Sequence, residues 1–262
     1  AWVESYMANA RPQKLIIIVP PGRFRELISS LTLPVAVVRL CNWVQRALPH
    51  VECHVIEGPV AYGHPITEAG EIKTHRALFE ELDTLVDDHT LVGFSTFANR
   101  DIVHALPLAR EIKRRFGSPI IMGGYAASTC PELIAASHHD LFDGVMSSAG
   151  EYGLVTLLEG MDGQRLGDRS TVANLVYWDG EQVRSNPKRN APRLREFPPL
   201  DLSVLRHASS YEQLPYFATA GCPYKCDFCY EPQIYPAYDK NKAEFVLRDL
   251  DRVLGQALET PF

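Results

Sequence analysis

An alternation of apolar strands and amphipathic helices constrains the fold of this chain more than any other feature of its sequence. The first strand is expected at 14–19, because the uninterrupted run KLIIIV is typical of a strand buried on both faces of a parallel sheet. Further strands are expected at 51–56, 91–95, 119–122 and 144–146, and helices at 34–48, 71–86, 102–115, 131–137 and 151–160. Parallel strands need such crossovers, so the pattern predicts a doubly wound, Rossmann-like α/β domain over 14–170.

The turns that follow the later strands are rich in small residues. Residues 123–128 read GGYAAS and residues 147–150 read SSAG. In a doubly wound domain a ligand lies across the carboxyl ends of the strands, where small residues let the backbone approach it closely. A flavodoxin-like core without such a ligand also needs glycine turns, so both interpretations stay open on this feature alone.

Three of the six cysteines lie in one short loop at the spacing C-x3-C-x2-C. They are Cys222, Cys226 and Cys229, between an expected strand at 214–220 and an expected helix at 242–258. Thiolates this close together on a turn can bind three corners of an iron–sulfur cube, whereas a full set of protein ligands would normally be four cysteines. The spacing therefore predicts a four-iron cluster with one iron left open.

Two other interpretations of these cysteines, a zinc site and a disulfide, are disfavoured. Structural zinc sites usually combine two Cys or His pairs, and no fourth cysteine or histidine follows Cys229 in the printed sequence. A disulfide is disfavoured because no secretory signal is visible and cytosolic thiols stay reduced. Cys41, Cys53 and Cys130 are expected to be buried structural thiols.

The loop GCPYKCDFCY at 221–230 resembles the signature of the radical S-adenosylmethionine (SAM) enzymes. The resemblance includes Phe228, the aromatic residue just before the last cysteine. It implies that Phe228 contacts a cofactor. It also implies that SAM binds the open iron, and that one electron from the 4Fe-4S cluster cleaves SAM to a 5′-deoxyadenosyl radical.

The order of small-residue turns after the third, fourth and fifth strands resembles the cobalamin-binding domain found ahead of many radical SAM domains. The match covers about residues 14–165. In that family these turns surround the nucleotide tail of cobalamin. The resemblance implies that the cobalamin contacts are Ser95, Thr96, Phe97, Asn99, Arg100, Gly123, Gly124, Tyr125, Ala126, Ser147, Ser148, Ala149, Gly150 and Glu151.

The chain departs from that family's pattern in two places. The usual Gly-Glu-Gly-Glu turn is Ser-Ala-Gly-Glu at 148–151, and the Asp-x-His-x-x-Gly loop that supplies a histidine to cobalt is missing after the first strand. His89 lies in a similar but longer motif before the third strand, so it is expected to be a surface histidine at a helix end.

Without that histidine, the lower face of cobalt is expected to be uncoordinated or bound to water. The nearest candidates are Tyr62 and His64 in one loop and Phe97, Asn99 and Arg100 in another. Asn99 and Arg100 are preferred because they closely follow Ser95. The alternative is that Arg100 and Asp101 only cap the helix that follows, since Asp and Asn favour such positions.

The remaining segments complete a multidomain organisation. Residues 1–13 are polar and are expected to be disordered or tag-like. An Asp-Gly turn indicates a hairpin that begins a proline-rich linker over 171–210. Residues 211–262 are expected to be the first strand–helix unit of a radical SAM (β/α) partial barrel, so the sequence is expected to be incomplete.

Composition excludes several function classes. The net charge of −6 disfavours a nucleic-acid-binding surface, and the basic run at 113–115 is interpreted as a solvated helix end. The apolar runs are too short to cross a bilayer, and no signal peptide is recognisable. A cytoplasmic protein with no nucleic-acid or membrane partner is expected.

Together these features predict a cobalamin-dependent radical SAM enzyme that uses a 4Fe-4S cluster, SAM and cobalamin. Its expected reaction is methyl transfer to a carbon centre through methylcobalamin and a 5′-deoxyadenosyl radical. A small-molecule or peptide substrate and an external electron donor are expected partners. The alternatives are a radical SAM ring-rearrangement or cyclisation enzyme, a non-catalytic cobalamin or iron–sulfur module, and an enzyme whose sheet domain binds no cobalamin.

Overall fold

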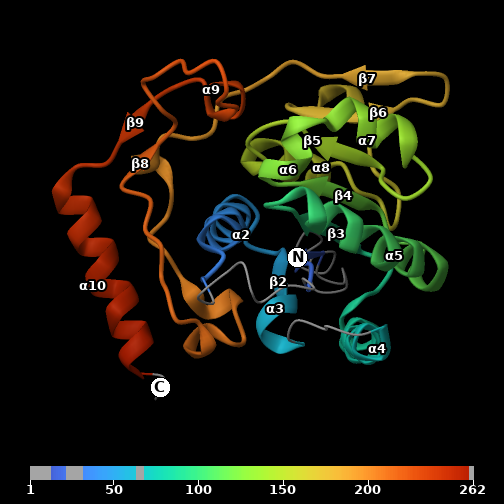
Figure 1. The fold of residues 1–262 in the computed structure, drawn as a ribbon, viewed down its shortest axis with the longest axis horizontal. Helices are drawn as coiled ribbons and strands as arrows, with labels where there is room; N and C mark the ends of the chain where they lie inside the picture. The colour runs from blue at the N-terminus through green and yellow to red at the C-terminus, as the bar shows by residue number, and fades with distance from the viewer. Residues whose placement is uncertain (1–12, 22–31, 63–67, 260–262) are drawn as a thin grey trace, which may run out of the picture.

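A single mostly parallel sheet organises the chain. The computed structural model describes residues 13–21, 32–62 and 68–259, and its main sheet has the order β2-β1-β3-β4-β5-β6-β7 (Figure 1). The first five strands are parallel: β1 (Lys14–Val19), β2 (Glu52–Glu57), β3 (Thr90–Ser95), β4 (Ile120–Gly123) and β5 (Gly144–Met146). The predicted doubly wound α/β fold is therefore confirmed.

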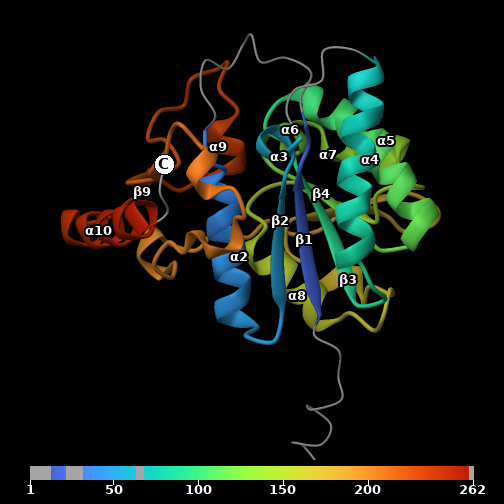
Figure 2. The ribbon, with the colours of Figure 1, turned by 90° about the horizontal axis from the view of Figure 1, so that it is seen from below.

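Helices cover both faces of this sheet, as Figure 2 shows. One face packs on α2 (Val35–Ala47) and α8 (Glu151–Glu159), and the other on α4 (Glu68–Leu85), α5 (Asn99–Phe116) and α7 (Pro131–Ser137). Alternate residues of β1 enter the two cores: Leu15 and Ile17 face α2, whereas Ile16 and Ile18 face α5. Burial on both faces explains why this strand is continuously apolar.

The predicted hairpin extends the sheet, whereas the sequence placed it at the start of a linker. It consists of β6 (Leu175–Trp178) and β7 (Val183–Ser185), and β6 pairs antiparallel with β5. Asn174, just before β6, is fully buried with a φ of 64° and donates from Nδ2 to the carbonyl oxygen of Ala149 at 2.7 Å. The hairpin is thus tied to the turn that follows β5.

Three loop predictions differ from the structure. The Gly-Gly turn is followed by a short helix, α6 (Tyr125–Thr129). The segment between the expected strand at 51–56 and the expected helix at 71–86 contains α3 (Gly58–Ala61). Helix α5 begins at Asn99 instead of residue 102, because the Asp101 carboxylate accepts the N–H groups of Phe97 and Ala98 at 2.9 and 2.8 Å. The helix-capping alternative is therefore confirmed for Asp101.

The segment after the hairpin runs along α2. Asn42 and Asp201 exchange two hydrogen bonds, from Asn42 Nδ2 to the Asp201 carbonyl at 3.1 Å and from the Asp201 N–H to Asn42 Oδ1 at 2.8 Å. Leu200, Leu202 and Val204 are buried against the same core as α2. Single 3-10 turns lie at Arg169–Thr171, Leu194–Glu196, Leu202–Val204 and Ala208–Ser210.

The last part of the chain lies on the α2 side of the sheet (Figures 1 and 2). Strand β8 (Thr219–Ala220) pairs antiparallel with β9 (Asp239–Lys240), and they are accompanied by α9 (Glu231–Ile234) and α10 (Ala243–Glu259). The predicted strand at 214–220 is wrong in length, because its partner β9 is only two residues long. Residue Leu214 packs on the sheet core instead of pairing.

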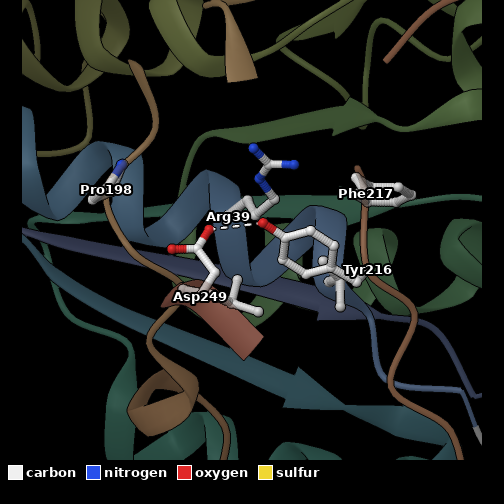
Figure 3. A pocket seen from close by; sticks show the side chains of 7 residues that line it. Arg39, Pro198, Tyr216, Phe217 and Asp249 are labelled. Carbon is white, nitrogen blue, oxygen red and sulfur yellow. Dashed lines mark hydrogen bonds between the residues drawn. The ribbon is translucent and has the colours of Figure 1, made fainter. Parts of the chain in front are cut away.

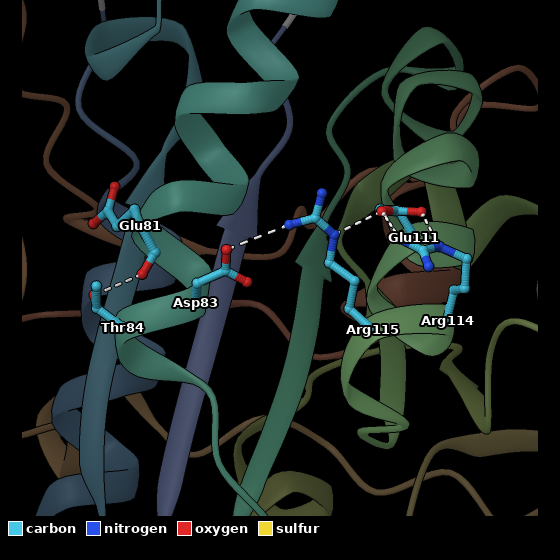
Figure 4. Close-up of polar contacts among 6 residues, drawn as sticks. All are labelled: Glu81, Asp83, Thr84, Glu111, Arg114 and Arg115. Carbon is cyan, nitrogen blue, oxygen red and sulfur yellow. Dashed lines mark hydrogen bonds and ion pairs between the residues drawn. The ribbon is translucent and has the colours of Figure 1, made fainter.

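The basic run at 113–115 is engaged in ion pairs on the face of the sheet opposite α2. Figure 4 shows Arg115 bridging Glu111 at 2.6 Å and Asp83 at 3.4 Å, which links α5 to α4, while Arg114 also pairs with Glu111 at 2.6 Å. Lys113 pairs with Asp143 at 2.6 Å. These contacts agree with a solvated helix end.

In the parts of the chain that the structure describes, no helix is both long enough and apolar enough to cross a membrane. The predicted disordered segment, apart from residue 13, and the cobalt-face candidate His64 lie outside the described residues.

Candidate functional site

A cavity of about 580 Å³ opens at the carboxyl edge of the sheet, on the face covered by α2 and α8. Its floor includes Ile17, Gly93, Ile121 and Met146, from β1, β3, β4 and β5. Gly93 pairs in register with Ile17 on one side and Ile121 on the other. Gly93 brings no side chain to this floor, which is therefore open above β3.

The turns after β3, β4 and β5 form one wall of this cavity, as the sequence predicted. The predicted residues that line it are Ser95, Thr96, Phe97, Gly123, Gly124, Tyr125, Ser148, Ala149, Gly150 and Glu151. The volume lies within the range of roughly 300–1,000 Å³ that is usual for cofactor sites. Glycine and alanine at the turns bring little side chain to this wall, so the site has room for the tail of a large cofactor such as cobalamin.

The other predicted cobalamin contacts do not line the cavity. Asn99 and Arg100 begin α5, and Ala126 is buried in α6. Ser147 uses its hydroxyl within the sheet, where Oγ donates to the carbonyl oxygen of Asn174 at 3.0 Å. Adjacent positions in one turn thus have different roles.

Thr96 and Gly124 join two of these turns to each other. The Thr96 hydroxyl donates to the Gly123 carbonyl at 2.9 Å and accepts the Ala127 N–H at 3.2 Å. Gly124 has a φ of +98°, and a Cβ there would lie 2.4 Å from the Thr96 carbonyl oxygen. Glycine is therefore required at 124 for the two turns to touch, besides any role toward a ligand.

Gly124→Ala is expected to lower the free energy of unfolding by about 1–3 kcal/mol or more, because strain at this φ adds to the clash with Thr96. Gly180→Ala is the matched control, since Gly180 has a φ of +114° but a Cβ there would meet nothing within 4 Å. Urea denaturation measures both variants. Equal losses would contradict the proposed contact between the turns.

Helix α2, the linker and the C-terminal segment supply cavity residues that the sequence analysis missed. They include Ala36, Val37, Arg39, Leu40, Ala191, Pro192, Leu194, Phe197, Phe217, Ile234 and Tyr235. The apolar periodicity of the α2 sequence predicts packing against the core and does not predict that some of its residues line a ligand cavity. The one available signal was the lone charge of Arg39 within the apolar stretch VAVVRLCNWV.

Glu151, the first residue of α8, brings a carboxyl group into the cavity wall. The residue as a whole is half-buried, but its Oε2 is shielded from solvent and has no hydrogen-bond partner among the described residues. Burial raises the pKa of this carboxyl, while the charge of Arg39 acts in the opposite direction. A carboxyl in this state can donate or accept a hydrogen bond from a bound ligand.

The burial of Glu151 predicts a pH-dependent effect on stability. In the unfolded chain the Glu151 carboxyl has its ordinary pKa of 4.5, whereas in the folded chain its pKa is higher. As pH rises above 4.5, the unfolded state therefore loses the proton first, and the free energy of unfolding falls until pH passes the folded pKa. The Glu151→Gln variant has no carboxyl group to ionise, so it avoids this loss. Its melting temperature is expected to lie roughly 2–4 °C above that of wild type at pH 8, which corresponds to a gain of about 1 kcal/mol in the free energy of unfolding.

The advantage of Glu151→Gln should disappear at pH 4. Glu132→Gln is the matched control, because Glu132 is exposed in the first turn of α7. Scanning calorimetry at both pH values measures the difference, and a gain that is the same at pH 4 and pH 8 would contradict the assignment.

The predicted cluster cysteines lie on one loop between β8 and α9. All three are free thiols: Cys226 is exposed, and Cys222 and Cys229 are half-buried. The Cys229 N–H donates to the Cys226 carbonyl at 3.0 Å, which closes a turn. Gly221 has a φ of +69°, and a Cβ there would lie 2.4 Å from the Ala237 carbonyl oxygen, so glycine is needed where the chain enters the loop.

The donor set of this loop fits an iron–sulfur cluster, because thiolates are the ligands such clusters require. Within the described ranges, no three Cys, His, Asp or Glu side chains converge closely enough to hold a metal ion. Binding therefore requires the thiols to turn toward a common centre. Phe228, the predicted aromatic contact, is 93% exposed on the same loop and does not line the cavity.

The cysteine loop lies at the rim of the cavity. Residues 219–221 line it directly, and the Ser148 hydroxyl donates to the Ile234 carbonyl at 2.5 Å across the two parts of the chain. The Tyr230 hydroxyl at the end of the cysteine loop donates to the Thr129 carbonyl of α6 at 3.0 Å. The fold therefore brings the two predicted cofactor regions together.

Comparison with known proteins points to one group of enzymes. No family model matches the sequence. The chain is 28% identical over 151 residues to bacteriochlorophyllide d C-8(2)-methyltransferase of Chlorobaculum tepidum, a match that covers 55% of this chain and 29% of that protein.

Two solved structures have similar folds. The cobalamin-dependent SAM radical enzyme OxsB, with aqua-cobalamin and SAM bound, gives a TM-score of 0.72 at 20% identity and covers 97% of this chain and 33% of that chain. The radical SAM methyltransferase TsrM from Kitasatospora setae, with tryptophan and a SAM analogue bound, gives a TM-score of 0.64 at 18% identity. That match covers 94% of this chain and 46% of the TsrM chain.

The chain therefore spans less than half the length of each of these proteins. At such identities the structural matches establish the fold. The resemblance drawn from the cysteine loop and the small-residue turns is confirmed at that level: the chain has the fold found in cobalamin-dependent radical SAM enzymes.

Proposed function

We propose that the protein is a cobalamin-dependent radical SAM methyltransferase that transfers a methyl group to a carbon centre of a small molecule or peptide. The observation that carries the proposal is the position of the cysteine loop at the rim of a cavity walled by the turns after β3, β4 and β5. The methyltransferase activities named for the curated relative and for TsrM support it.

In this proposal the residues of the chain divide into two cofactor sites. The turn residues at 95–97, 123–125 and 148–151 hold the tail of cobalamin through backbone atoms, against the floor around Gly93. Cys222, Cys226 and Cys229 would hold the 4Fe-4S cluster together with SAM, and an external electron donor is the expected partner. When bound, the cluster and SAM would supply a carbon-centred radical, and cobalamin would supply the methyl group.

The protein's own share is placement and exclusion of water. The apolar floor and the side chains of α2 and α8 line one side of the cavity and would limit the access of water to a reactive intermediate there. The hydrogen bond from Ser148 to Ile234 holds the cysteine segment against the turn after β5, which limits the distance between the two sites.

The function is tested with the full-length protein, reconstituted anaerobically with iron, sulfide and cobalamin and supplied with a reductant and SAM deuterated at its methyl group. Candidate small molecules and peptides are incubated with it and analysed by mass spectrometry. A product that gains a deuterated methyl group only when cobalamin is present supports the proposal.

Two other outcomes would contradict methyl transfer. Formation of 5′-deoxyadenosine with a rearranged, unlabelled product would indicate a ring-rearrangement or cyclisation enzyme. Failure to cleave SAM, with both cofactors bound, would indicate a non-catalytic binding module.

A further inference from the structure

Arg39 of α2 lies at the boundary between the large cavity and a small neighbouring one. It lines both, and the small cavity is also lined by Pro198, Tyr216, Phe217 and Asp249 (Figure 3). The Tyr216 hydroxyl donates to Asp249 Oδ2 at 2.9 Å, so the nearest polar groups bond to each other. In Figure 3 the guanidinium points away from that pair.

Aromatic rings position the guanidinium of Arg39. Its Cζ lies 4.2 Å from the ring centre of Phe197 and 6.0 Å from that of Phe217. Contacts of this kind stabilise a cation through its planar face and leave the N–H groups at its edge free to donate. Among the residues the structure describes, no carboxylate forms an ion pair with Arg39 and no acceptor takes a hydrogen bond from it.

The charge of Arg39 is therefore incompletely compensated. Burial lowers its pKa, which means that its surroundings disfavour the charged form. Among the described residues that line the large cavity, Arg39 is the one lysine or arginine. The carboxyl groups of Glu151 and Asp249 favour the charged form of Arg39 and oppose this lowering of its pKa, but neither forms an ion pair with it.

We propose that Arg39 binds an oxyanion carried by the ligand of this cavity, an inference that rests on the proposed function. A guanidinium recognises phosphate or carboxylate through paired, charge-assisted hydrogen bonds. Under that function two groups have this chemistry: the phosphodiester in the nucleotide tail of cobalamin and the carboxylate of SAM. The first is favoured, because Arg39 lines the same cavity as the turns assigned to that tail.

The test measures binding to the full-length protein by absorbance and fluorescence titration. Arg39→Met removes the charge and keeps much of the side-chain volume, whereas Arg39→Lys keeps the charge. The ligands are hydroxocobalamin, cobinamide, which lacks the phosphodiester, SAM, and 5′-methylthioadenosine, which lacks the carboxylate. Arg46→Met is the matched control: Arg46 lies on the same helix, 4.4 Å over the Trp43 ring, and does not line the cavity.

Arg39→Met is expected to weaken binding of cobalamin about 10- to 100-fold, the loss that goes with a charge-assisted hydrogen bond, and to leave cobinamide binding unchanged. Arg39→Lys should recover part of the affinity, and unchanged cobinamide binding shows that the variant is folded. If Arg39→Met weakens the binding of SAM but not that of 5′-methylthioadenosine, the result would support the same inference and identify the SAM carboxylate as the oxyanion.

Wild-type affinity of Arg39→Met for both cobalamin and SAM would overturn the inference while leaving the proposed function intact. A loss of equal size for cobalamin and cobinamide, with no selective loss for SAM, would also overturn it. If the wild-type protein binds neither cobalamin nor SAM, the proposed function fails and this inference fails with it.

Discussion

Replacing Cys222, Cys226 and Cys229 with alanine is expected to remove essentially all iron and sulfide that the protein acquires on anaerobic reconstitution. The reason is that each iron bond to the protein is a thiolate bond, and these are the three free thiols of the loop. Elemental analysis per chain, together with the absorbance of the cluster, measures the effect.

Cys130→Ala is the matched control for this experiment, because Cys130 is a half-buried free thiol outside the loop, just before α7. It should retain wild-type iron content. An alanine triple variant that keeps its iron would contradict the assignment, as would zinc in place of iron in the wild-type protein.

Gly150→Phe is expected to weaken cobalamin binding at least about 100-fold, because an aromatic side chain would fill the cavity. Gly150 lines that cavity, and the atoms nearest to a Cβ there would belong to Leu154 and Leu40, at 3.9 Å, which is an ordinary van der Waals contact. Its φ of −91° is open to any residue, so the variant adds bulk without backbone strain. Gly124 is unsuitable for this purpose, because any side chain there collides with Thr96.

Gly255→Phe is the matched control for bulk, since a Cβ at Gly255 on α10 would meet nothing within 4 Å. The iron content of both variants should equal that of wild type, which separates loss of the cavity from loss of the fold. Unchanged cobalamin absorbance in Gly150→Phe after gel filtration would show that the cavity is not the binding site.

The sheet was predictable because its strands carry strong local signals. Strand β1 is a short β-branched run with helical patterns after it. Its burial on both faces is typical of a strand in a parallel sheet. The Asp-Gly turn predicts the hairpin of β6 and β7, but no local pattern predicts that the hairpin joins the main sheet. Its place in the sheet depends on pairing with β5 and on the buried side chain of Asn174, neither of which leaves a local pattern.

The candidate site was predicted as a set of turns more reliably than as a set of side chains. Ser147 and Ser148 are equivalent in sequence terms, yet one bonds to Asn174 inside the sheet and the other to Ile234 beside the cavity. Which way each hydroxyl points is decided by elements far away in the chain. Arg39 was missed for the same reason, because its aromatic neighbours come from the linker and the C-terminal segment.

The central claim is that one cavity and one cysteine loop hold cobalamin and a 4Fe-4S cluster side by side. It is tested most directly by electron paramagnetic resonance of the cob(II)alamin form in the full-length, reconstituted protein. A reduced cluster close to cobalt should shorten the spin relaxation time of cob(II)alamin, and the effect should be absent when the cluster is oxidised and in the Cys226→Ala variant. Relaxation that is the same with a reduced and an oxidised cluster would contradict the claim.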